Sequence, residues 1–450
     1  MSNSRPIVWV IAWSVLIAAT LFCRDCLGAD INKYLILAEY LIAFACLESG
    51  GIEMLLAFSM PFSYGLPFNY IALLGVVFLI GKRGKLPNEI VLLLLIYLAF
   101  QELAMTYWYT SIDLGAEAGY ISCLFLLVLL ATGDSENSNR VLIFFVVGTA
   151  LAFLMVIQRT IESVPLESLF GGSARLGYGG SGAYGADTAG SISEMYVSFN
   201  PNEVGYYSLV SLACGFLLLI KSNASRLLLL SCMGVSLLAG VLSQSRTWIM
   251  MVTALVVIQV LLSIRRSHEC GRAFIALAVV VGVAVVIVSL NPMLIDTIVQ
   301  RFEGGDFASA NGRTELFDGY NKWFASQSWR AFFGTGVVSY KEVAGLWNSM
   351  HSGVQQVYVC LGIVGASVFV SILIFLGIQG TRHSKDFTPI NFLPLIAAFA
   401  FSQSIQLINP WTLVLPFALG FVALGAGGAS RKGIREVLNL GVLSHEKISH

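Results

Sequence analysis

The chain has 450 residues, of which 57% are hydrophobic and 12% are charged, and its formal net charge is zero. Soluble domains usually carry about 25% charged residues, so this composition excludes an ordinary soluble protein and predicts an integral membrane protein. A net charge of zero also argues against recruitment of nucleic acid by a bulk electrostatic field.

Apolar runs recur along the chain and predict an all-α integral membrane protein with about fourteen transmembrane helices. The first run follows Arg5, as in a signal peptide, but further runs follow at once, so we expect a retained helix. Pro61, Gly65 and Pro67 interrupt the third and fourth runs, which predicts a broken or re-entrant hairpin. The expected spans are 7–23, 34–49, 50–63, 67–80, 88–107, 119–132, 141–158, 201–220, 227–243, 247–264, 273–290, 353–377, 389–407 and 410–427.

Basic residues recur in every second loop between these runs. The positive-inside rule therefore places these loops, and both chain termini, in the cytoplasm. The basic residues are Lys82, Arg83, Lys85, Arg140, Lys221, Arg226, Arg265, Arg266, Arg272, Arg382, Lys385, Arg431, Lys432 and Arg435.

Two long loops then remain on the extracytoplasmic side, where function concentrates in such chains. The expected organisation is an N-terminal transmembrane bundle at 1–158, an extracytoplasmic loop at 159–200, central transmembrane helices at 201–290, a large extracytoplasmic loop with an interfacial helix at 291–350, C-terminal transmembrane helices at 351–430 and a cytoplasmic tail at 431–450.

Arginines on the expected outer side oppose the orientation bias and need a reason. Their planar guanidinium groups suit phosphate or carboxylate, so we expect an anionic ligand there. Contacts with lipid phosphates or with neighbouring acidic side chains are the alternative. The arginines are Arg159, Arg175, Arg246, Arg301, Arg313 and Arg330.

Arg246 and Arg313 occupy the most informative places. Arg246 lies in a very short turn, Ser243–Thr247, between two apolar runs, where a charge is costly unless an anion matches it. Arg313 precedes Leu316, Phe317, Tyr320, Trp323 and Phe324, whose helical spacing predicts a short amphipathic helix in the outer interface. Arg313 would then lie in the first turn, beside free backbone N–H groups; a plain interfacial anchor helix is the alternative.

His351 is the histidine expected on the outer face, at the entry to a late span. Neutral imidazole can accept a proton from a hydroxyl near neutral pH, so we assign it a catalytic role, with a structural histidine as the alternative. The segment 200–203 (Asn-Pro-Asn-Glu) predicts a capped helix start, and Glu203 at the membrane is a functional candidate. The sequence shows no metal-ligand spacing.

These motifs, in this order, resemble those of the O-antigen ligase and polymerase superfamily, which includes the Wzy-like polymerases. The matching motifs are Asn200-Pro201-Asn202 with Gly205, the Ser243–Arg246 turn, Asn311-Gly312-Arg313 with Trp323, Phe333-Gly334-Thr335-Gly336, and His351 before Gly362 and Gly365. Ser352 stands where the family often has asparagine after the histidine.

The resemblance implies a GT-C-like fold in the bacterial cytoplasmic (inner) membrane, with its active site on the extracytoplasmic face. It also implies a metal-independent, inverting glycosyl transfer from an undecaprenyl-diphosphate-linked oligosaccharide. Arg246 and Arg313 would bind the diphosphate, and His351 would activate the acceptor hydroxyl. We assign substrate binding to Arg175, Arg301, Arg330, Asn200, Asn202, Glu203 and Tyr320.

A polymerase of repeat units is the favoured function, because such chains are numerous and diverse. A ligase that transfers finished glycan to another acceptor stays open, as does a transporter or flippase of a lipid-linked anionic substrate. The expected partners are the lipid-linked oligosaccharide and membrane lipid, with a chain-length regulator as a further candidate.

Overall fold

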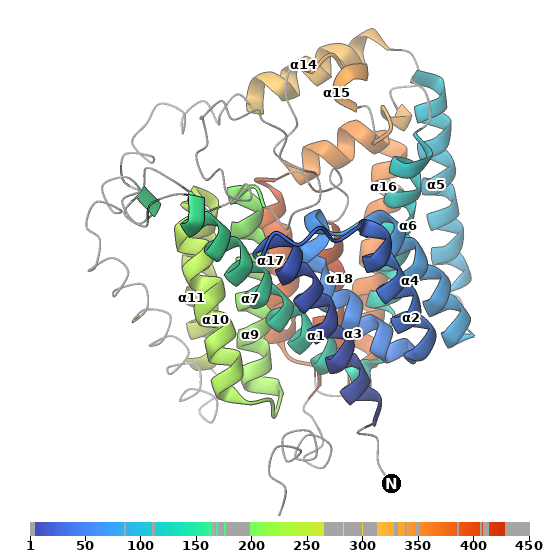
Figure 1. The fold of residues 1–450 in the computed structure, drawn as a ribbon. Coiled ribbons are helices and arrows are strands. Elements are labelled where there is room, and N and C mark those ends of the chain that lie inside the picture. The colour runs from blue at the N-terminus through green and yellow to red at the C-terminus, as the bar shows by residue number, and fades with distance from the viewer. Residues whose placement is uncertain are drawn as a thin grey trace, which may run out of the picture.

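A computed structural model describes residues 5–84, 87–109, 113–163, 165, 168–169, 175–176, 199–264, 282, 299, 313–327, 332–337, 340–346, 352–384, 387–405, 407 and 414–427. Every regular element in these ranges is helical (Figure 1). The α-helices are α1 (Arg5–Asp25), α2 (Lys33–Cys46), α3 (Ser49–Ser59), α4 (Phe68–Arg83), α5 (Glu89–Tyr109), α6 (Leu114–Ala131), α7 (Ser138–Ser163), α9 (Pro201–Lys221), α10 (Arg226–Ser243), α11 (Arg246–Ile264), α14 (Arg313–Ser326), α15 (Tyr340–Val343), α16 (Gly353–His383), α17 (Leu393–Ser402) and α18 (Leu415–Gly425). Short 3₁₀ helices are η1 (Met60–Gly65), η2 (Ser135–Asn137) and η7 (Pro389–Phe392).

Seven helices in the described ranges are long and apolar enough to cross a membrane. They confirm an all-helical, multi-pass architecture, but not the expected fourteen full spans. The apolar segments at 34–49, 50–63, 67–80, 389–407 and 410–427 form helices shorter than the required length. The expected span 273–290 lies outside the described residues apart from residue 282.

The expected interruption of the third run is present in the structure. Helix α3 has 11 residues, and at about 1.5 Å per residue it is too short to cross the roughly 30 Å hydrocarbon core. The chain then tightens into η1, whose second residue is Pro61, before α4 begins at Phe68. Proline cannot donate an intrahelical hydrogen bond, and this explains the broken hairpin.

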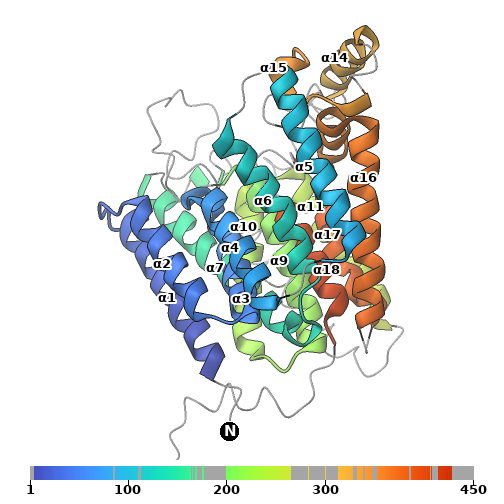
Figure 2. The same cartoon turned by 90° about the vertical axis from the view of Figure 1, so that its right-hand side faces the viewer.

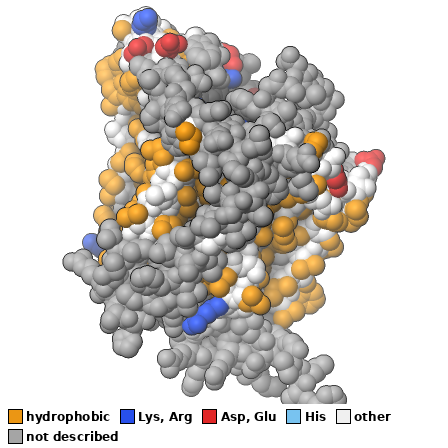
Figure 3. Space-filling view, turned by 90° about the vertical axis from the view of Figure 1, so that its left-hand side faces the viewer, with side chains coloured by type: hydrophobic (Ala, Val, Ile, Leu, Met, Phe, Trp, Pro, Cys, Tyr) orange, Lys and Arg blue, Asp and Glu red, His pale blue; other side chains and the backbone are white. Residues whose placement is uncertain are grey.

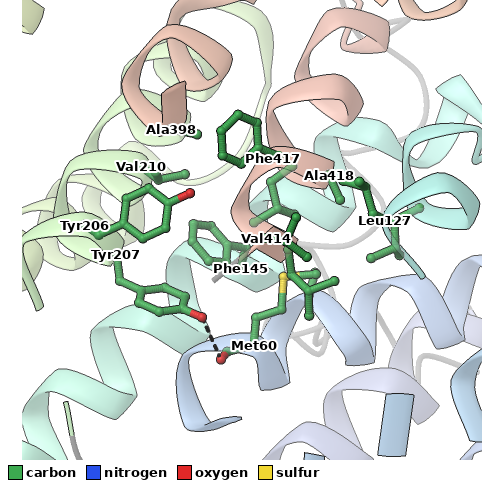
Figure 4. Close-up of a cluster of buried hydrophobic side chains, with 14 of the residues drawn as sticks. Met60, Leu127, Phe145, Tyr206, Tyr207, Val210, Ala398, Val414, Phe417 and Ala418 are labelled. Carbon is green, nitrogen blue, oxygen red and sulfur yellow. Dashed lines mark hydrogen bonds between the residues drawn. The ribbon is translucent and has the colours of Figure 1, made fainter. Parts of the chain in front are cut away.

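Helix α9 is the most buried of the long helices and packs against α7, α10 and α17. Two adjacent tyrosines of α9 pack in the core between this helix and its neighbours (Figure 4). Tyr206 and Tyr207 are fully buried, and the Tyr207 hydroxyl donates a hydrogen bond to the Met60 carbonyl oxygen at 3.3 Å. Phe145 of α7 stacks at a tilt on Tyr207, with ring centroids 6.3 Å apart. The start of α9 is therefore held by elements from both halves of the chain.

Large apolar side chains remain exposed on the outside of the helices. Trp9, Leu93, Phe100 and Ile374 are examples, and a soluble monomer rarely exposes so continuous an apolar surface. Figure 3 shows hydrophobic side chains at mid-height on one face, acidic and basic ones at its upper end and basic ones near its lower end. This distribution is typical of a membrane-embedded bundle.

Cys23 lies in the last turn of α1, and Cys26 follows the end of that helix. Both are free thiols in the structure. Burial raises the pKa of the Cys26 thiol to about 11, and the neighbouring Asp25 carboxylate adds to the rise. Cys26 is consequently protonated, and poorly nucleophilic, at neutral pH.

Candidate functional site

The turn between α10 and α11, residues Ser243–Arg246, is built from its own side chains. The Ser243 hydroxyl donates to the Gly240 carbonyl at 2.6 Å, and the Ser245 N–H donates to the Ser243 hydroxyl at 3.3 Å. Gln244 takes a left-handed conformation with φ of 50° and is buried. Serine side chains offer the backbone these local bonds readily, so two helices can meet without a longer loop.

The start of α9 is joined to this turn. Asn200 and Glu203 form a capping box, in which the Asn200 side chain accepts from the Asn202 N–H at 3.0 Å and Glu203 accepts from the Asn200 N–H at 2.8 Å. The Ser245 hydroxyl donates to the Asn202 side-chain oxygen at 3.2 Å. The predicted helix start is confirmed, and two motifs 43 residues apart meet here.

Arg175 reaches the same turn from the first long loop. Its Nε donates to the Ser243 carbonyl oxygen at 2.9 Å, and the next N–H, of Leu176, donates to the Leu242 carbonyl oxygen at 2.9 Å. These bonds satisfy carbonyl groups that the end of α10 leaves without helical partners. The structure therefore brings together Arg175, Asn202 and Arg246, which the sequence assigned to one site.

Arg246 is the first residue of α11 and is half-buried. Within the described part of the chain its guanidinium has no hydrogen-bond or ion-pair partner, whereas the arginines of the two ion pairs found there, Arg24 and Arg83, contact Asp25 and Glu53. Free N–H groups and the positive end of the helix dipole lie beside it. A partly desolvated guanidinium at a helix N-terminus is well suited to bind phosphate.

Trp248 of α11 lies two residues after Arg246, and the sequence did not indicate a role for it. Its indole N–H donates to the Ser208 hydroxyl at 2.9 Å, and Ser208 donates to the Ser236 carbonyl at 2.6 Å. A Cβ on Gly240 would lie 2.2 Å from the Trp248 ring. Two features of the sequence could have indicated this contact. One is a glycine in α10 opposite a tryptophan just after a tight turn, and the other is the presence of serines in apolar helices.

The predicted amphipathic helix exists as α14, which begins at Arg313. Leu316 and Tyr320 are buried, and the Tyr320 ring stacks on Trp323 at 5.3 Å and meets Tyr358 of α16 edge-on at 5.5 Å. Burial raises the pKa of Tyr320, so its hydroxyl is neutral at physiological pH. Figures 1 and 2 show α14 above the ends of α5 and α16.

Several predicted site residues lie outside what can be described. His351, Arg301 and Arg330 lie outside the described residues, and so does the side chain of Arg313. Tyr320, assigned to substrate binding, is fully buried among aromatic rings in this structure. Its role in binding stays a prediction.

Ser352, the residue after His351, belongs to the described part of the chain. Ser352 caps α16, and Gly353 packs so closely on α17 that a Cβ would lie 2.8 Å from the Ser402 carbonyl oxygen. The Gln356 side chain accepts from the Leu407 N–H at 2.7 Å. Since Phe401 of α17 packs on Tyr206 with ring centroids 5.7 Å apart, the start of α16 is connected through α17 to the start of α9.

A separate cavity of about 160 Å³ lies where α6 ends and α7 begins. Glu53, Thr132, Asp134 and Gln379 contribute to its lining. None of the predicted site residues lines it, and the Ser243–Arg246 turn belongs to other helix ends. The candidate site is therefore the turn with its three supporting segments.

Comparison with known protein families gives a match over part of the chain. Residues 229–370 match the family model described as O-antigen ligase. This part of the chain is therefore similar to the O-antigen ligase family. The matched region includes Arg246, Arg313, Phe333–Gly336 and His351, and begins after α9. A search among curated proteins finds no match.

Proposed function

We propose that the protein polymerises undecaprenyl-diphosphate-linked oligosaccharide repeat units of an O-antigen, capsule or exopolysaccharide. The observation that carries the proposal is the half-buried Arg246 guanidinium, which has no partner among the described residues and lies on a turn within the family-matched region. The protein would work in the bacterial cytoplasmic membrane, with both termini in the cytoplasm and the site on the extracytoplasmic face.

The chemistry is a metal-independent glycosyl transfer with inversion. The acceptor hydroxyl attacks the anomeric carbon from the face opposite the diphosphate, and the bond between that carbon and the phosphate oxygen breaks. The electron pair of this bond leaves with the diphosphate, whose growing charge Arg246 and Arg313 stabilise. His351 takes the proton of the acceptor hydroxyl.

The remaining assigned residues would hold the substrate. Arg175 and Asn202 are bonded to the Ser243–Arg246 turn. Together with Asn200 and Glu203 they would form the wall of the diphosphate site. Arg301 and Arg330 from the second long loop, with Tyr320 of α14, are proposed to contact the glycan. A chain-length regulator remains a candidate partner.

A ligase is the second candidate, because the matching family model is described as O-antigen ligase. It would use the same donor and the same arginines but another acceptor. The family match favours either enzyme over a transporter or flippase.

The test is a transfer assay with the purified protein and its lipid-linked repeat unit in the presence of a chelator. A ladder of products identifies a polymerase, and transfer only to a separate acceptor identifies a ligase. Absence of any transfer in this assay would contradict the proposed enzyme.

Substitution of Arg246 tests its role directly. Arg246→Ala should lower the turnover rate by about 10²–10³, because one preorganised cationic donor is lost, and Arg246→Lys should recover part of it. Arg313→Ala and His351→Ala should also be impaired. Arg226→Ala, at the other end of α10, is the matched control; wild-type activity of Arg246→Ala at equal protein level would reject the assignment.

A further inference from the structure

Helix α16 is interrupted at Gly362. The backbone there has φ of 62° and ψ of −170°, inside a helix that otherwise runs from Gly353 to His383. A break in a helix leaves the preceding carbonyl groups without their partners. Figure 1 shows the upper part of α16 leaning away from the line of its lower part.

The loop 332–337 provides the missing donors. The Thr335 N–H donates to the Val359 carbonyl at 3.1 Å, and the Gly336 N–H donates to the Cys360 carbonyl at 3.0 Å. The approach is so close that a Cβ on Gly334 would lie 2.3 Å from the Cys360 carbonyl oxygen. The family-like motif Phe333–Gly336 is therefore a backbone insertion into the break of α16.

Helix α5 holds this insertion with two adjacent buried side chains. The Gln101 amide nitrogen donates to the carbonyl oxygens of Phe333 and Leu361, both at 2.7 Å, and so bridges the loop and the helix break. The Glu102 carboxylate accepts from the Val337 N–H at 2.6 Å. Both side chains are almost fully buried, where such bonds are costly to lose.

Glycines leave the space that these two side chains occupy. A Cβ on Gly365 would lie 2.6 Å from the Gln101 amide nitrogen, and one on Gly336 would lie 3.4 Å from the Glu102 carboxylate oxygen. The glycines belong to the family-matched region, whereas α5 lies outside it. The N-terminal half of the chain thus contributes side chains that the matched region is shaped to receive.

The lean of the first part of α16 determines where that helix starts. Its first residues rest on Ser402 and Leu407 of the α17 end, and α17 packs on α9, whose start is bonded to the Ser243–Arg246 turn. A straight α16 would begin elsewhere. The direction of these few residues therefore sets the distance between the entry to α16 and Arg246.

We propose that Gln101 and Glu102 are positioning residues for glycosyl transfer. They keep the loop 332–337 in the break of α16 and thereby hold the start of α16, next to His351 in the sequence, in place for the acceptor. This inference rests on the proposed function. Neither side chain is proposed to touch substrate, and Glu102 acts as a hydrogen-bond acceptor rather than as a proton carrier.

The test uses near-isosteric variants. Gln101→Met and Glu102→Met should each lower kcat about tenfold or more, while KM for the lipid-linked donor stays unchanged. Each variant loses hydrogen bonds of buried groups, and this loss reduces the fraction of molecules in which the loop 332–337 is held in the break of α16 about tenfold or more. Glu102→Gln should stay close to wild type, because an amide oxygen accepts the same N–H. Phe100→Leu, on the exposed face of α5, is the matched control and should leave kcat and KM unchanged.

Hydrogen exchange gives a readout that does not depend on catalysis. The amides of Thr335, Gly336 and Val337 should be protected in the wild type and should exchange about tenfold faster or more in both methionine variants. Gln101→Glu, which keeps the size but loses the donor pair, replaces Gln101→Met if the latter does not fold.

Wild-type kcat in both methionine variants, unchanged exchange, or a Glu102→Gln variant as slow as Glu102→Met would each overturn the inference. If the wild type itself transfers no glycan, the proposed function fails, and the exchange data alone decide whether the two residues hold the loop.

Discussion

Trp248 and Gly240 show how single residues hold the candidate site. The indole ring lies where any side chain on residue 240 would be, and its N–H is bonded to Ser208. Gly205 of α9 lies close to the same residue, with a would-be Cβ 3.2 Å from the Trp248 Cβ. The turn that carries Arg246 thus rests on an aromatic side chain enclosed by two glycine-bearing helices.

Gly240→Ala should destabilise the protein by about 1–3 kcal/mol, because the added methyl group overpacks a closed contact. It should also reduce activity, since Trp248 and the neighbouring Arg246 would shift. Gly234→Ala on the same helix is the control; nothing lies within 4 Å of its would-be Cβ. Thermal unfolding in detergent measures both, and equal melting temperatures for the two variants would contradict the packing argument.

At this scale the sequence was most informative about charge. Arg175 and Arg246 stood out because arginines on the expected outer side oppose the orientation bias, and both lie at one turn. Trp248 and Ser208 could not be recognised, because a tryptophan and a serine in apolar helices are ordinary until their partners are known. Tyr320 was assigned to substrate, whereas the structure places it in an aromatic core.

Among the elements, α16 departs most from what its sequence suggests. Its apolar run predicts one straight span, yet the helix is interrupted at Gly362 by a backbone conformation that is essentially restricted to glycine. The run itself contains no proline. The break depends on the loop 332–337 and on Gln101, which is 260 residues from its acceptor on Leu361.

Gly362→Ala should abolish most activity and should lower stability by about 1–3 kcal/mol from backbone strain alone. A further cost arises because the new Cβ would lie 2.3 Å from the Phe332 carbonyl oxygen. Gly377→Ala on the same helix is the control, since its nearest neighbour is 3.9 Å away. The comparison needs the transfer assay and a thermal scan, and a fully active, stable Gly362→Ala variant would refute the break.

The short helices α3, α17 and α18 illustrate a second limit of the sequence. Prolines and a glycine predicted the interruption after α3, but nothing in the sequence predicted that α17 and α18 would each be too short to cross the bilayer alone. Their ends depend on 3₁₀ turns and on contacts with α7, α9 and α16. Hydropathy counts apolar residues and is insensitive to where the helix stops.

At the scale of the whole molecule, the membrane topology stays a prediction that rests on the basic residues at helix ends. Lys82 and Arg83 end α4, Lys221 ends α9 and Arg226 begins α10. The turn with Arg246 lies at the opposite end of α10 from Arg226. The expected extracytoplasmic site therefore requires that these two ends face different sides of the membrane.

Single cysteines in a background without native cysteines test this topology. Leu114→Cys, at the exposed start of α6, should react with an impermeant maleimide added to spheroplasts. Asn223→Cys and Asn88→Cys, in exposed parts of two basic loops, should react only after permeabilisation. Labelling of positions 114 and 223 from the same side would contradict the orientation and, with it, the extracytoplasmic site.

The amino-acid sequence alone determined the helical membrane class, the position of the long spans and the charged turn at residue 246. Each of these follows from local properties, namely apolar length, charge and capping residues within a few positions. Only the tertiary structure decided the broken α16, the Asn202–Ser245 bond and the role of Gln101 and Glu102, because these contacts join residues 43 to 260 positions apart. Buried polar groups must find partners wherever the fold places them, and no local pattern specifies which distant partner that is.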